Sequence, residues 1–452
     1  MNNDTIAAIS TKLGVGAISI IRVSGPDSLT IVNSIFKGKD LTKVKSHTIN
    51  YGYIIDNEKI IDEVLVSVML APKTFTKEDV VEINCHGAIS TTLKIFELLQ
   101  EKGCRVADPG EFTKRAFLNG RIDLTEAESV MDLINSNTDS ARQLAISNLT
   151  GSLKNYITTF RNKIKKILAN IEVNIDYPEY YDIEEITLDN INTLIKDLTK
   201  DLTNLITISE DCQIIKNGIK TIIIGRPNVG KSSILNTFLQ ENKAIVTDVA
   251  GTTRDIVEGT ISFDGLTLSL IDTAGIHETN NKVEKIGVEK SLDLINDADL
   301  IILVLNGSEP LTENDKLIIE KVKSKNTIVV LNKNDLPSKV DQTFLNFSHV
   351  VSTNTNSIEG IMPLKQEIKK MFNQNELLEK DYTYLANNRQ LILAKKALKS
   401  LEEAKNSLEN NAPIDIIEVD LKDVFYYLGE IIGENYSEEL LDELFSNFCV
   451  GK

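Results

Sequence analysis

A glycine-rich loop between a predicted strand and a predicted helix is the feature that most constrains the fold of this chain. Residues 220–225 read as a buried strand, residues 225–232 read G-R-P-N-V-G-K-S, and residues 232–239 have a helical pattern. A strand, a glycine turn and a helix N-terminus together point backbone N–H groups at an anion. Lys231 would reach the terminal phosphates of a nucleotide, and Ser232 would offer its hydroxyl to Mg²⁺. The loop predicts phosphate binding, but the motif alone also occurs by chance.

Two further motifs follow in the order that a nucleotide-binding domain requires. Residues 272–275 read D-T-A-G after an apolar strand, so Asp272 can hold a water on Mg²⁺ and Gly275 can contact the γ-phosphate. Residues 251–255 read G-T-T-R-D and stand between this motif and the phosphate loop. They form a switch-like loop in which a threonine hydroxyl can complete the Mg²⁺ shell.

The motif N-K-N-D at residues 332–335 selects the base. Asp335 would accept hydrogen bonds from the N1–H and the 2-amino group of guanine, whereas adenine has no donors there and would leave the carboxylate unpaired. A purine-contacting loop should follow the next strand, where residues 352–354 read S-T-N in place of the usual S-A-K. These motifs together predict a GTP-binding domain. Its candidate GTP-binding residues are Asn228, Val229, Gly230, Lys231, Ser232, Ser233, Thr247, Asp248, Val249, Ala250, Gly251, Thr252, Thr253, Asp272, Thr273, Ala274, Gly275, Asn332, Lys333, Asp335, Ser352, Thr353 and Asn354.

The residue that orients the attacking water in Ras-like proteins is missing from this sequence. Ile276 follows the D-T-A-G motif at the position where those proteins have a glutamine, and an isoleucine cannot orient water. Asn228 stands where some GTPases use an amide oxygen to hold a monovalent cation. A K⁺ at that point would replace an arginine finger electrostatically. Alternatively, Asn228 hydrogen-bonds only its own loop, and the chemistry alone leaves both readings open.

Composition limits the classes of protein to which the chain can belong. Its 452 residues correspond to roughly three domains. The net charge of -17 argues against broad, non-specific capture of nucleic acid, although not against a local basic patch. Four scattered cysteines without C-x-x-C spacing argue against a zinc site or a disulfide framework. With neither a signal-peptide pattern nor an apolar run of membrane-spanning length, the sequence predicts a cytoplasmic protein that does not enter membranes.

The periodicity of apolar residues predicts an inserted domain. Residues 1–120 have short alternating runs typical of a strand-rich α+β domain, and residues 121–215 and 374–452 have helical periodicity. Residues 216–373 alternate strands and helices, as in a doubly wound α/β fold. We therefore expect an α+β N-terminal domain and an α-helical central domain with an inserted α/β P-loop (Ras-like) G domain. Two independent helical segments are the alternative.

Motifs along the whole chain resemble those of the tRNA modification GTPase family MnmE, also called TrmE. In the G domain these are G-R-P-N-V-G-K-S-S, A-G-T-T-R-D, D-T-A-G-I and V-E-K-I-G. The G domain alone would also suit ribosome-assembly GTPases of the Era or Der type, which act without modification chemistry. The flanks favour MnmE: residues 110–121 read G-E-F-T-K-R-A-F-L-N-G-R, residues 78–87 read E-D-V-V-E-I-N-C-H-G, and the chain ends C-V-G-K. No KH-type RNA module with a G-x-x-G loop is found.

The resemblance implies a K⁺-activated GTPase whose G domains dimerise across their nucleotide faces. It places K⁺ on Asn228, the main chains of Thr247 and Val249, and Thr252. It places Mg²⁺ on Ser232 and Thr253. Glu284, in V-E-K-I-G, corresponds to the family's catalytic glutamate, which acts on the water indirectly. Without the resemblance, Glu284 would read as a solvent-facing helix carboxylate.

The resemblance also implies a folate site and a partner. A 5-formyl- or methylene-tetrahydrofolate site maps onto Arg22, Glu82, Arg121 and Lys452, in an N-terminal domain that forms a constitutive homodimer. Arg121 stands where lysine is common, which keeps the charge but changes the hydrogen-bond geometry. The family forms a heterotetramer with the FAD-containing protein MnmG (GidA). The two proteins together install an aminomethyl or carboxymethylaminomethyl group on the wobble uridine of certain tRNAs.

Two further side chains have plain structural interpretations. For Cys449 we favour a packing residue or an exposed thiol over a nucleophile, because no histidine stands in an obvious position to activate it. For His86 we favour a hydrogen bond to a backbone carbonyl over a place in the folate pocket. On sequence alone, Arg22 at the end of a strand would be an ordinary surface ion pair.

Overall fold

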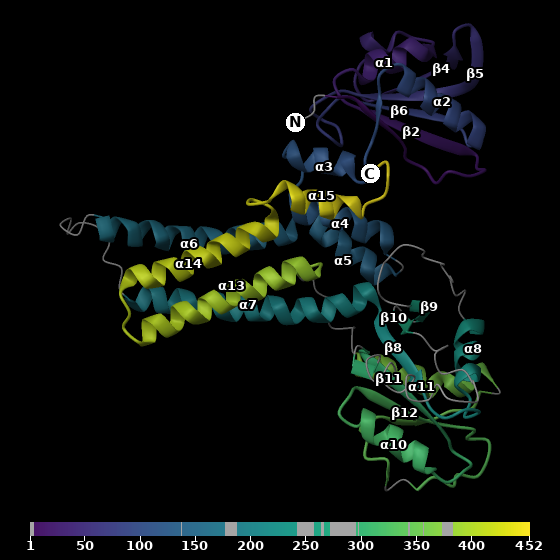
Figure 1. Ribbon diagram of the computed structural model, residues 1–452, viewed down its shortest axis with the longest axis vertical. Coiled ribbons are helices and arrows are strands. Elements are labelled where there is room, and N and C mark those ends of the chain that lie inside the picture. The colour runs from purple at the N-terminus through teal and green to yellow at the C-terminus, as the bar shows by residue number, and fades with distance from the viewer. Residues whose placement is uncertain are drawn as a thin grey trace. The chain divides into compact units, whose positions relative to one another are not determined.

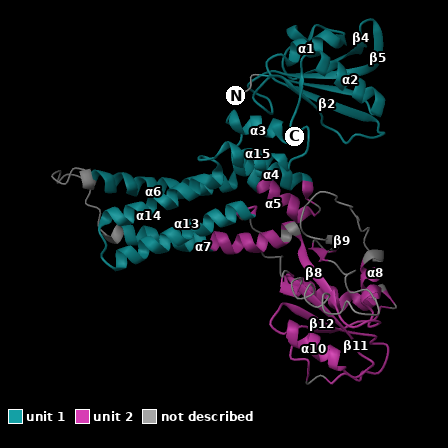
Figure 2. Cartoon of the chain, in the orientation of Figure 1, with its two compact units in different colours: residues 1–134, 148–203, 388–452 teal, residues 135–147, 204–387 magenta. Residues whose placement is uncertain are grey.

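The computed structural model describes residues 4–136, 138–176, 188–241, 257–263, 266–271, 295–296, 298–341, 344–355, 357–372 and 383–452. The chain forms two compact units (Figure 2). The first consists of Met1–Ile134, Asn148–Thr203 and Asn388–Lys452, and the second of Asn135–Ser147 and Asn204–Asn387. In sequence, most of the second unit therefore lies between two segments of the first. Among the described residues, no helix is both long and apolar enough to cross a membrane.

The first unit begins with a seven-stranded sheet in the order β3-β4-β5-β6-β2-β1-β7. Helices α1 (Ser28–Ile35) and α2 (Ile89–Glu101) bury its core on one face, as the shared apolar cluster of helix and strand residues shows. The strand-rich α+β character predicted for residues 1–120 is confirmed. The strands are β1 (Ile6–Ile9), β2 (Ile18–Ser24), β3 (Phe36–Lys37), β4 (Thr48–Asp56), β5 (Lys59–Met69), β6 (Val80–His86) and β7 (Arg105–Val106).

The opposite face of this sheet is not covered by α1 or α2. Strand side chains alternate between faces, so Ile21 and Val23 of β2 enter the core while Arg22 points the other way. Register puts Ile49, Ser67, Glu82 and Arg22 in one row across β4, β5, β6 and β2. Tyr51 and Leu65 occupy the next row. Ile49 is 69% exposed, Tyr51 56% and Leu65 46%. We call this surface, with Ile49, Tyr51, Leu65, Glu82 and Arg22, the open sheet face.

Helices make up the rest of the first unit (Figure 1). Helix α14 packs against both α13 and α6 and buries Leu421, Val424 and Leu428, in agreement with the helical periodicity of residues 374–452. Helix α15 packs against α3, and the cluster of Phe117, Leu124 and Phe445 fills the space between them. The helices of this unit are α3 (Glu111–Leu118), α4 (Leu124–Asn135), α6 (Ser152–Asp176), α13 (Asn388–Glu409), α14 (Ile414–Ile432) and α15 (Glu438–Ser446). Along the chain, α7 (Leu188–Asn217) begins in the first unit and ends in the second, and most of α5 (Asp139–Leu149) belongs to the second.

The second unit contains a six-stranded sheet in the order β13-β12-β11-β8-β10-β9, with only β9 antiparallel. Both faces are covered, which explains why β11 and β12 are continuous apolar runs buried along their whole length. Helices α8 and α11 share one core cluster with the sheet, and α10 shares the other. The elements are β8 (Ile219–Ile224), α8 (Lys231–Glu241), β9 (Val257–Phe263), β10 (Leu266–Ile271), β11 (Leu300–Asn306), α10 (Glu313–Val322), β12 (Thr327–Asn332), β13 (Val350–Ser352), η4 (Ile358–Ile361) and α11 (Met362–Met371).

This architecture confirms the predicted fold class: an α+β N-terminal part, a helical part and an inserted, doubly wound α/β part. The segment before α13 is held firmly within the second unit. The backbone N–H of Leu385 donates to Ser209 Oγ at 2.8 Å, and Lys216 Nζ donates to the carbonyl of Ala386 at 2.7 Å. Tyr384 and Ala386 are buried against Leu144 and Cys212.

Candidate nucleotide-binding site

The phosphate loop joins β8 to α8 through two glycines at positions where a side chain would be strained. Gly225 has φ 148°, and a Cβ on it would lie 2.3 Å from the carbonyl oxygen of Val304 in β11. Gly230 has φ 106°, and a Cβ on it would lie 2.0 Å from Asn332 Nδ2. Both are left-handed conformations that L side chains rarely adopt. The backbone therefore turns tightly between the end of a parallel strand and a helix N-terminus, a geometry that suits an anion.

Lys231 lies over this loop. Its Nζ donates to the carbonyl oxygens of Gly225 at 2.6 Å and of Arg226 at 3.0 Å. Burial lowers the pKa of this ammonium group. Arg226, in contrast, is directed toward the start of α10, where its guanidinium pairs with Glu309 and Asp315. Lys231 is therefore the loop cation available for phosphate oxygens.

Asn228 lies at the exposed tip of the loop with a left-handed backbone, φ 64°. Asparagine tolerates this conformation better than most residues. Within the described part of the chain, its side chain makes no hydrogen bond. The structure therefore disagrees with the alternative in which Asn228 merely bonds its own loop.

The asparagine of N-K-N-D connects the phosphate loop to the base-side loops. Asn332 Nδ2 donates to the carbonyl oxygen of Val229 at 2.9 Å, and Thr353 Oγ1 donates to Asn332 Oδ1 at 3.3 Å. The Asn334 N–H donates to the Thr353 carbonyl at 3.1 Å. Asp335 lies exposed in the turn that follows. Asn332, Val229 and Thr353 are thus held as one unit at the carboxyl ends of the strands, the edge where ligands of doubly wound sheets bind.

The S-T-N residues predicted to contact the purine lie at the end of β13. Ser352 still pairs with Leu331 in the sheet, and the N–H of Thr353 donates to the Leu331 carbonyl at 2.9 Å. The N–H of Asn354 donates to the Gly360 carbonyl at 3.1 Å. Thr355 is the next residue, and its N–H makes no hydrogen bond to any described residue. Ser352 is thus the last residue paired in the sheet, and Thr353 and Asn354 follow it with their backbone N–H groups bonded within the protein.

Part of the predicted site lies outside the described residues. Outside the phosphate loop, the residues predicted to contact Mg²⁺, K⁺ and the γ-phosphate are not described. Ile276 and the catalytic candidate Glu284 are not described either. The described residues contain no cluster of three or more His, Cys, Asp or Glu side chains suited to a metal. The predicted residues outside the description are Thr247, Asp248, Val249, Ala250, Gly251, Thr252, Thr253, Asp272, Thr273, Ala274 and Gly275.

A second polar cluster in the first unit contains the residues predicted to bind folate. Arg22 and Glu82 form a two-pronged ion pair on the open sheet face, with Nε–Oε1 and Nη2–Oε1 distances of 2.8 Å. Arg22 Nη1 also donates to the carbonyl oxygen of Gly451 at 3.2 Å, next to Lys452. The Arg22 and Arg121 guanidinium carbons lie 5.7 and 4.8 Å from the centre of the Phe75 ring. Arg22, Glu82 and Arg121 therefore gather around Phe75, with Lys452 next to the Gly451 carbonyl.

Phe75 was not a candidate from the sequence, because no motif marks it. Its position between two arginines depends on the loop before β6 and could be found only in the fold. His86 also differs from expectation. Its Nδ1 pairs with the Asp62 carboxylate at 2.7 Å rather than with a backbone carbonyl, and this hydrogen bond raises the pKa of His86. Cys449 is exposed, as one of the two predicted interpretations has it.

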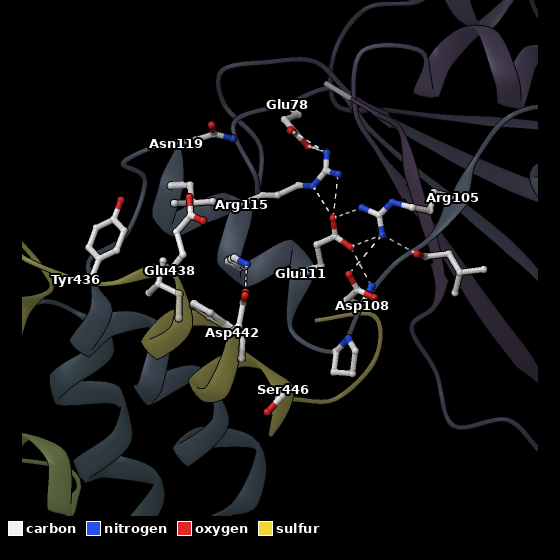
Figure 3. A pocket seen from close by; sticks show the side chains of 16 residues that line it. Glu78, Arg105, Asp108, Glu111, Arg115, Asn119, Tyr436, Glu438, Asp442 and Ser446 are labelled. Atoms are coloured by element: carbon white, nitrogen blue, oxygen red, sulfur yellow. Dashed lines mark hydrogen bonds and ion pairs between the residues drawn. The ribbon is translucent and has the colours of Figure 1, made fainter. Parts of the chain in front are cut away.

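Side chains of helix α3 line a cavity of about 1060 Å³ (Figure 3). Phe112 of α3 lies under Arg22, at 5.7 Å, while Glu111 and Arg115 line the cavity. Arg115 pairs with Glu111 at 3.0 Å and with Glu78 at 3.1 Å, and Arg105 also pairs with Glu111. Burial alone would raise the pKa of Glu111, but the hydrogen bonds from Arg105, Asp108 and Arg115 outweigh it and hold that pKa below its ordinary value. The network fixes the helix that supports Arg22.

The doubly wound sheet, the phosphate loop with Lys231, and the asparagine of N-K-N-D that ties this loop to the base side define a GTP-binding protein of the P-loop class. Comparison with known proteins narrows the class. The family model of the MnmE helical domain matches residues 124–449, and that of the GTP-binding protein TrmE N-terminus matches residues 5–121. The chain belongs to the MnmE family of tRNA modification GTPases.

Curated relatives agree over nearly the full length. The tRNA modification GTPase MnmE of Streptococcus thermophilus is 52% identical over 99% of this chain and 98% of its own. That of Lactobacillus delbrueckii is also 52% identical, with the same coverage. Among solved structures, the G domain of the T. maritima FeoB iron transporter is 29% identical, covers 34% of this chain and 98% of its own, and has a TM-score of 0.26.

Proposed function

We propose that this protein hydrolyses GTP in the service of tRNA modification. The observation that carries the proposal is the link from Asn332 to the Val229 carbonyl, which joins the phosphate loop to the guanine-selecting N-K-N-D segment. Family membership supports the tRNA assignment. The test is nucleoside analysis of tRNA from cells that lack the gene. Loss of a wobble-uridine modification is expected, and an unchanged modification would overturn the assignment.

The finer chemistry that we propose is the installation of the 5-carboxymethylaminomethyl or aminomethyl group on the wobble uridine of certain tRNAs. A tetrahydrofolate one-carbon unit would supply the carbon. The FAD-containing MnmG (GidA) would be the partner, in a heterotetramer, in the cytoplasm. On this proposal, residues 1–120 form the N-terminal domain and residues 216–373 form the G domain. The G domain is inserted between two helical segments, residues 121–215 and 374–452. Co-purification tests this assembly. The full chain should co-purify with MnmG, and a chain that lacks residues 1–120 should not.

We propose that K⁺ activates hydrolysis, held by Asn228 with Thr247, Val249 and Thr252. The Asn228 side chain has no partner among the described residues, which leaves its amide oxygen available to a cation. Mg²⁺ would be held by Ser232 and Thr253. GTP turnover should be faster in KCl than in NaCl, and Asn228→Ala should remove the difference while GDP still binds. Equal rates of the unaltered protein in the two salts would overturn the K⁺ proposal.

We propose Glu284 as the catalytic carboxylate, because Ile276 cannot orient water. Glu284→Ala should abolish GTP hydrolysis and leave GDP affinity unchanged. Glu313→Ala is a matched control, since Glu313 is an exposed helix carboxylate of the same unit. A Glu284→Ala protein that hydrolyses GTP as fast as this control would refute the role.

We propose that Arg22, Glu82, Arg121 and Lys452 bind the folate. The two guanidinium groups around Phe75 could meet carbonyl or carboxylate oxygens, and Glu82 could accept from pterin nitrogens. Calorimetry with 5-formyl-tetrahydrofolate should show at least about tenfold weaker binding for Arg22→Gln, the loss of one charge-assisted contact. Lys94→Gln, which changes a half-buried, ion-paired lysine of the same sheet domain, should bind normally. Equal binding by both variants would overturn the site.

We propose that the open sheet face forms the homodimer. It exposes Ile49, Tyr51 and Leu65 side by side, and contiguous exposed apolar residues are typical of interaction sites. Ile49→Asp should shift the sedimentation of the protein from dimer to monomer. Leu317→Asp is the matched control, because Leu317 is 61% exposed on α10 of the other unit. If Ile49→Asp remains as dimeric as the control, the dimer forms elsewhere.

A further inference from the structure

A lysine between β5 and β6 has a backbone conformation that its residue type rarely adopts. Lys77 lies in residues 70–79, which we call the β5–β6 loop, and its φ of 59° falls in the left-handed region that favours glycine. Such a residue persists only where the surrounding structure holds it, and these conformations are common at functional sites. The contacts of the Lys77 side chain show what holds it.

The ammonium group of Lys77 binds the turn that follows α3, residues 119–121, which we call the α3 turn. Lys77 Nζ donates to the carbonyl oxygens of Asn119 and Gly120, each at 3.0 Å. A cation at this point also meets the negative end of the α3 helix dipole. One side chain therefore satisfies two consecutive backbone acceptors just beyond the end of α3.

The α3 turn bonds back to the β5–β6 loop. Asn119 Nδ2 donates to the carbonyl oxygen of Thr76 at 2.7 Å, so the two segments exchange hydrogen bonds in both directions. Within the α3 turn, the Arg121 N–H donates to the Ala116 carbonyl at 2.9 Å and closes the end of the helix. That bond fixes the shape of the turn, whereas the bonds of Lys77 and Asn119 fix its distance from the β5–β6 loop.

This distance determines the contact between two residues of the proposed folate site. Phe75 lies in the β5–β6 loop, two positions before Lys77, and Arg121 follows Gly120 in the α3 turn. The Arg121 guanidinium carbon lies 4.8 Å from the centre of the Phe75 ring, within the roughly 6 Å over which a cation and an aromatic ring attract. The cation and the ring can meet only while the two segments lie together.

We propose that Lys77 is a positioning residue for folate binding: it docks the α3 turn onto the β5–β6 loop and so holds Arg121 over Phe75. The proposal rests on the proposed folate site. Lys77 needs no contact with the ligand, since its ammonium group is occupied by the two carbonyls. Without it, the α3 turn would move away from the loop, and the site would lose the charge-assisted contact of the Arg121 guanidinium.

A double-mutant cycle in the full chain tests whether Lys77 acts through Arg121. Calorimetry with 5-formyl-tetrahydrofolate gives the dissociation constant of each variant. Lys77→Met keeps the unbranched stem and should weaken binding about fivefold, the scale of one net hydrogen bond. In an Arg121→Gln background, the same change should weaken binding by less than about twofold, because no guanidinium remains to be positioned. In an Arg22→Gln background it should still cost about fivefold, since Glu82 and the Gly451 carbonyl hold Arg22 independently.

Two further substitutions separate the side chain of Lys77 from its backbone. Lys77→Arg keeps a cation that can donate to both carbonyls, so it should restore most of the affinity. Lys77→Gly relieves the left-handed backbone but removes the donor, so it should bind folate as weakly as Lys77→Met. It also serves in place of Lys77→Met if that variant does not fold.

Lys43→Met is the matched control. Lys43 is an exposed, ion-paired lysine of the same sheet domain, and it ends the short helix η1 (Leu41–Lys43), which packs against α1 on the covered face of the sheet. Folate binding by Lys43→Met should equal that of the unaltered protein.

Equal losses from Lys77→Met with and without the Arg121 guanidinium would overturn the proposal, and Lys77 would then stabilise the domain without positioning Arg121. Unchanged binding by Lys77→Met would overturn it as well. Failure of the proposed folate site looks different. In that case the unaltered protein would bind no 5-formyl-tetrahydrofolate, and the positioning role would fall together with the site.

Discussion

Replacing Glu128 by alanine should open the first turns of α13 far more than replacing an exposed glutamate does. Glu128, in α4, is 8% exposed and accepts from Arg389 Nε at 2.8 Å and Arg389 Nη2 at 3.0 Å. Gln390 donates to the same carboxylate. Arg389 also donates to the carbonyls of Glu430 at 2.8 Å and Ile431 at 3.0 Å, at the end of α14. One carboxylate therefore organises the meeting point of three helices.

The magnitude follows from burial. Removing one partner of a buried, hydrogen-bonded ion pair costs about 3–5 kcal/mol, because the other charge is left uncompensated. Arg389 keeps its two carbonyl acceptors, so we expect the lower end, about 3 kcal/mol. Glu128→Gln keeps an acceptor of the same shape and should cost about 1–2 kcal/mol. Glu172→Ala is the control, since its partner Lys422, at 3.1 Å, is exposed, and an exposed pair is worth about 0–1 kcal/mol.

Hydrogen exchange on the full chain is the assay. A chain of several domains does not unfold in one step, whereas exchange reports local opening free energies. A cost of about 3 kcal/mol corresponds to amide hydrogen exchange that is more than a hundredfold faster, about 160-fold, at the start of α13. Glu172→Ala should change the exchange of its own region by less than about sixfold. Exchange in Glu128→Ala that is no faster than in Glu128→Gln would refute the reasoning that an unpaired buried charge dominates.

Three other predictions concern the two sites. The pKa of Glu111 in the folded protein is held below its ordinary value of 4.5. The ion pairs of Glu111 therefore stabilise the fold above pH 4.5, and this stabilisation is lost as the pH falls through the pKa of the folded state. Near-UV circular dichroism should show an acid transition, and Glu111→Gln should weaken it. Gly230 has φ 106°, and a Cβ on it would lie 2.0 Å from Asn332 Nδ2. In a fluorescence titration, Gly230→Ala should therefore weaken GDP binding by more than about a hundredfold. Gly103→Ala, in the other unit, should leave GDP binding unchanged. Asp335→Asn should change the binding preference of the protein from GDP to the xanthine nucleotide, because the C2 carbonyl of xanthine accepts a hydrogen bond from the asparagine amide. An unchanged preference would mean that Asp335 does not recognise the base.

The nucleotide class was predictable from the sequence because its determinants are local. A run of strand-forming residues, a glycine turn and a helix start dictate the anion-binding geometry at residues 225–232 within one short segment. The buried strands β8, β11 and β12 were predictable for the same reason, since parallel strands covered on both faces are continuous apolar runs. Local backbone preferences and short spacings were sufficient for these elements.

Contacts between distant segments were decided by the tertiary structure. Arg22 meets Glu82 and the Gly451 carbonyl across 60 and 429 positions, and nothing in the local pattern encodes those meetings. The end of β13 is a further case: the N–H of Thr353 donates to the Leu331 carbonyl of β12, and the letters S-T-N do not encode this pairing. Register is set by how whole strands pair, because one residue of slip exchanges every side chain between faces. The sequence alone determined that this chain binds GTP; packing decided which distant segments meet at each site, as Asn332 meets the Val229 carbonyl and Arg22 the Gly451 carbonyl.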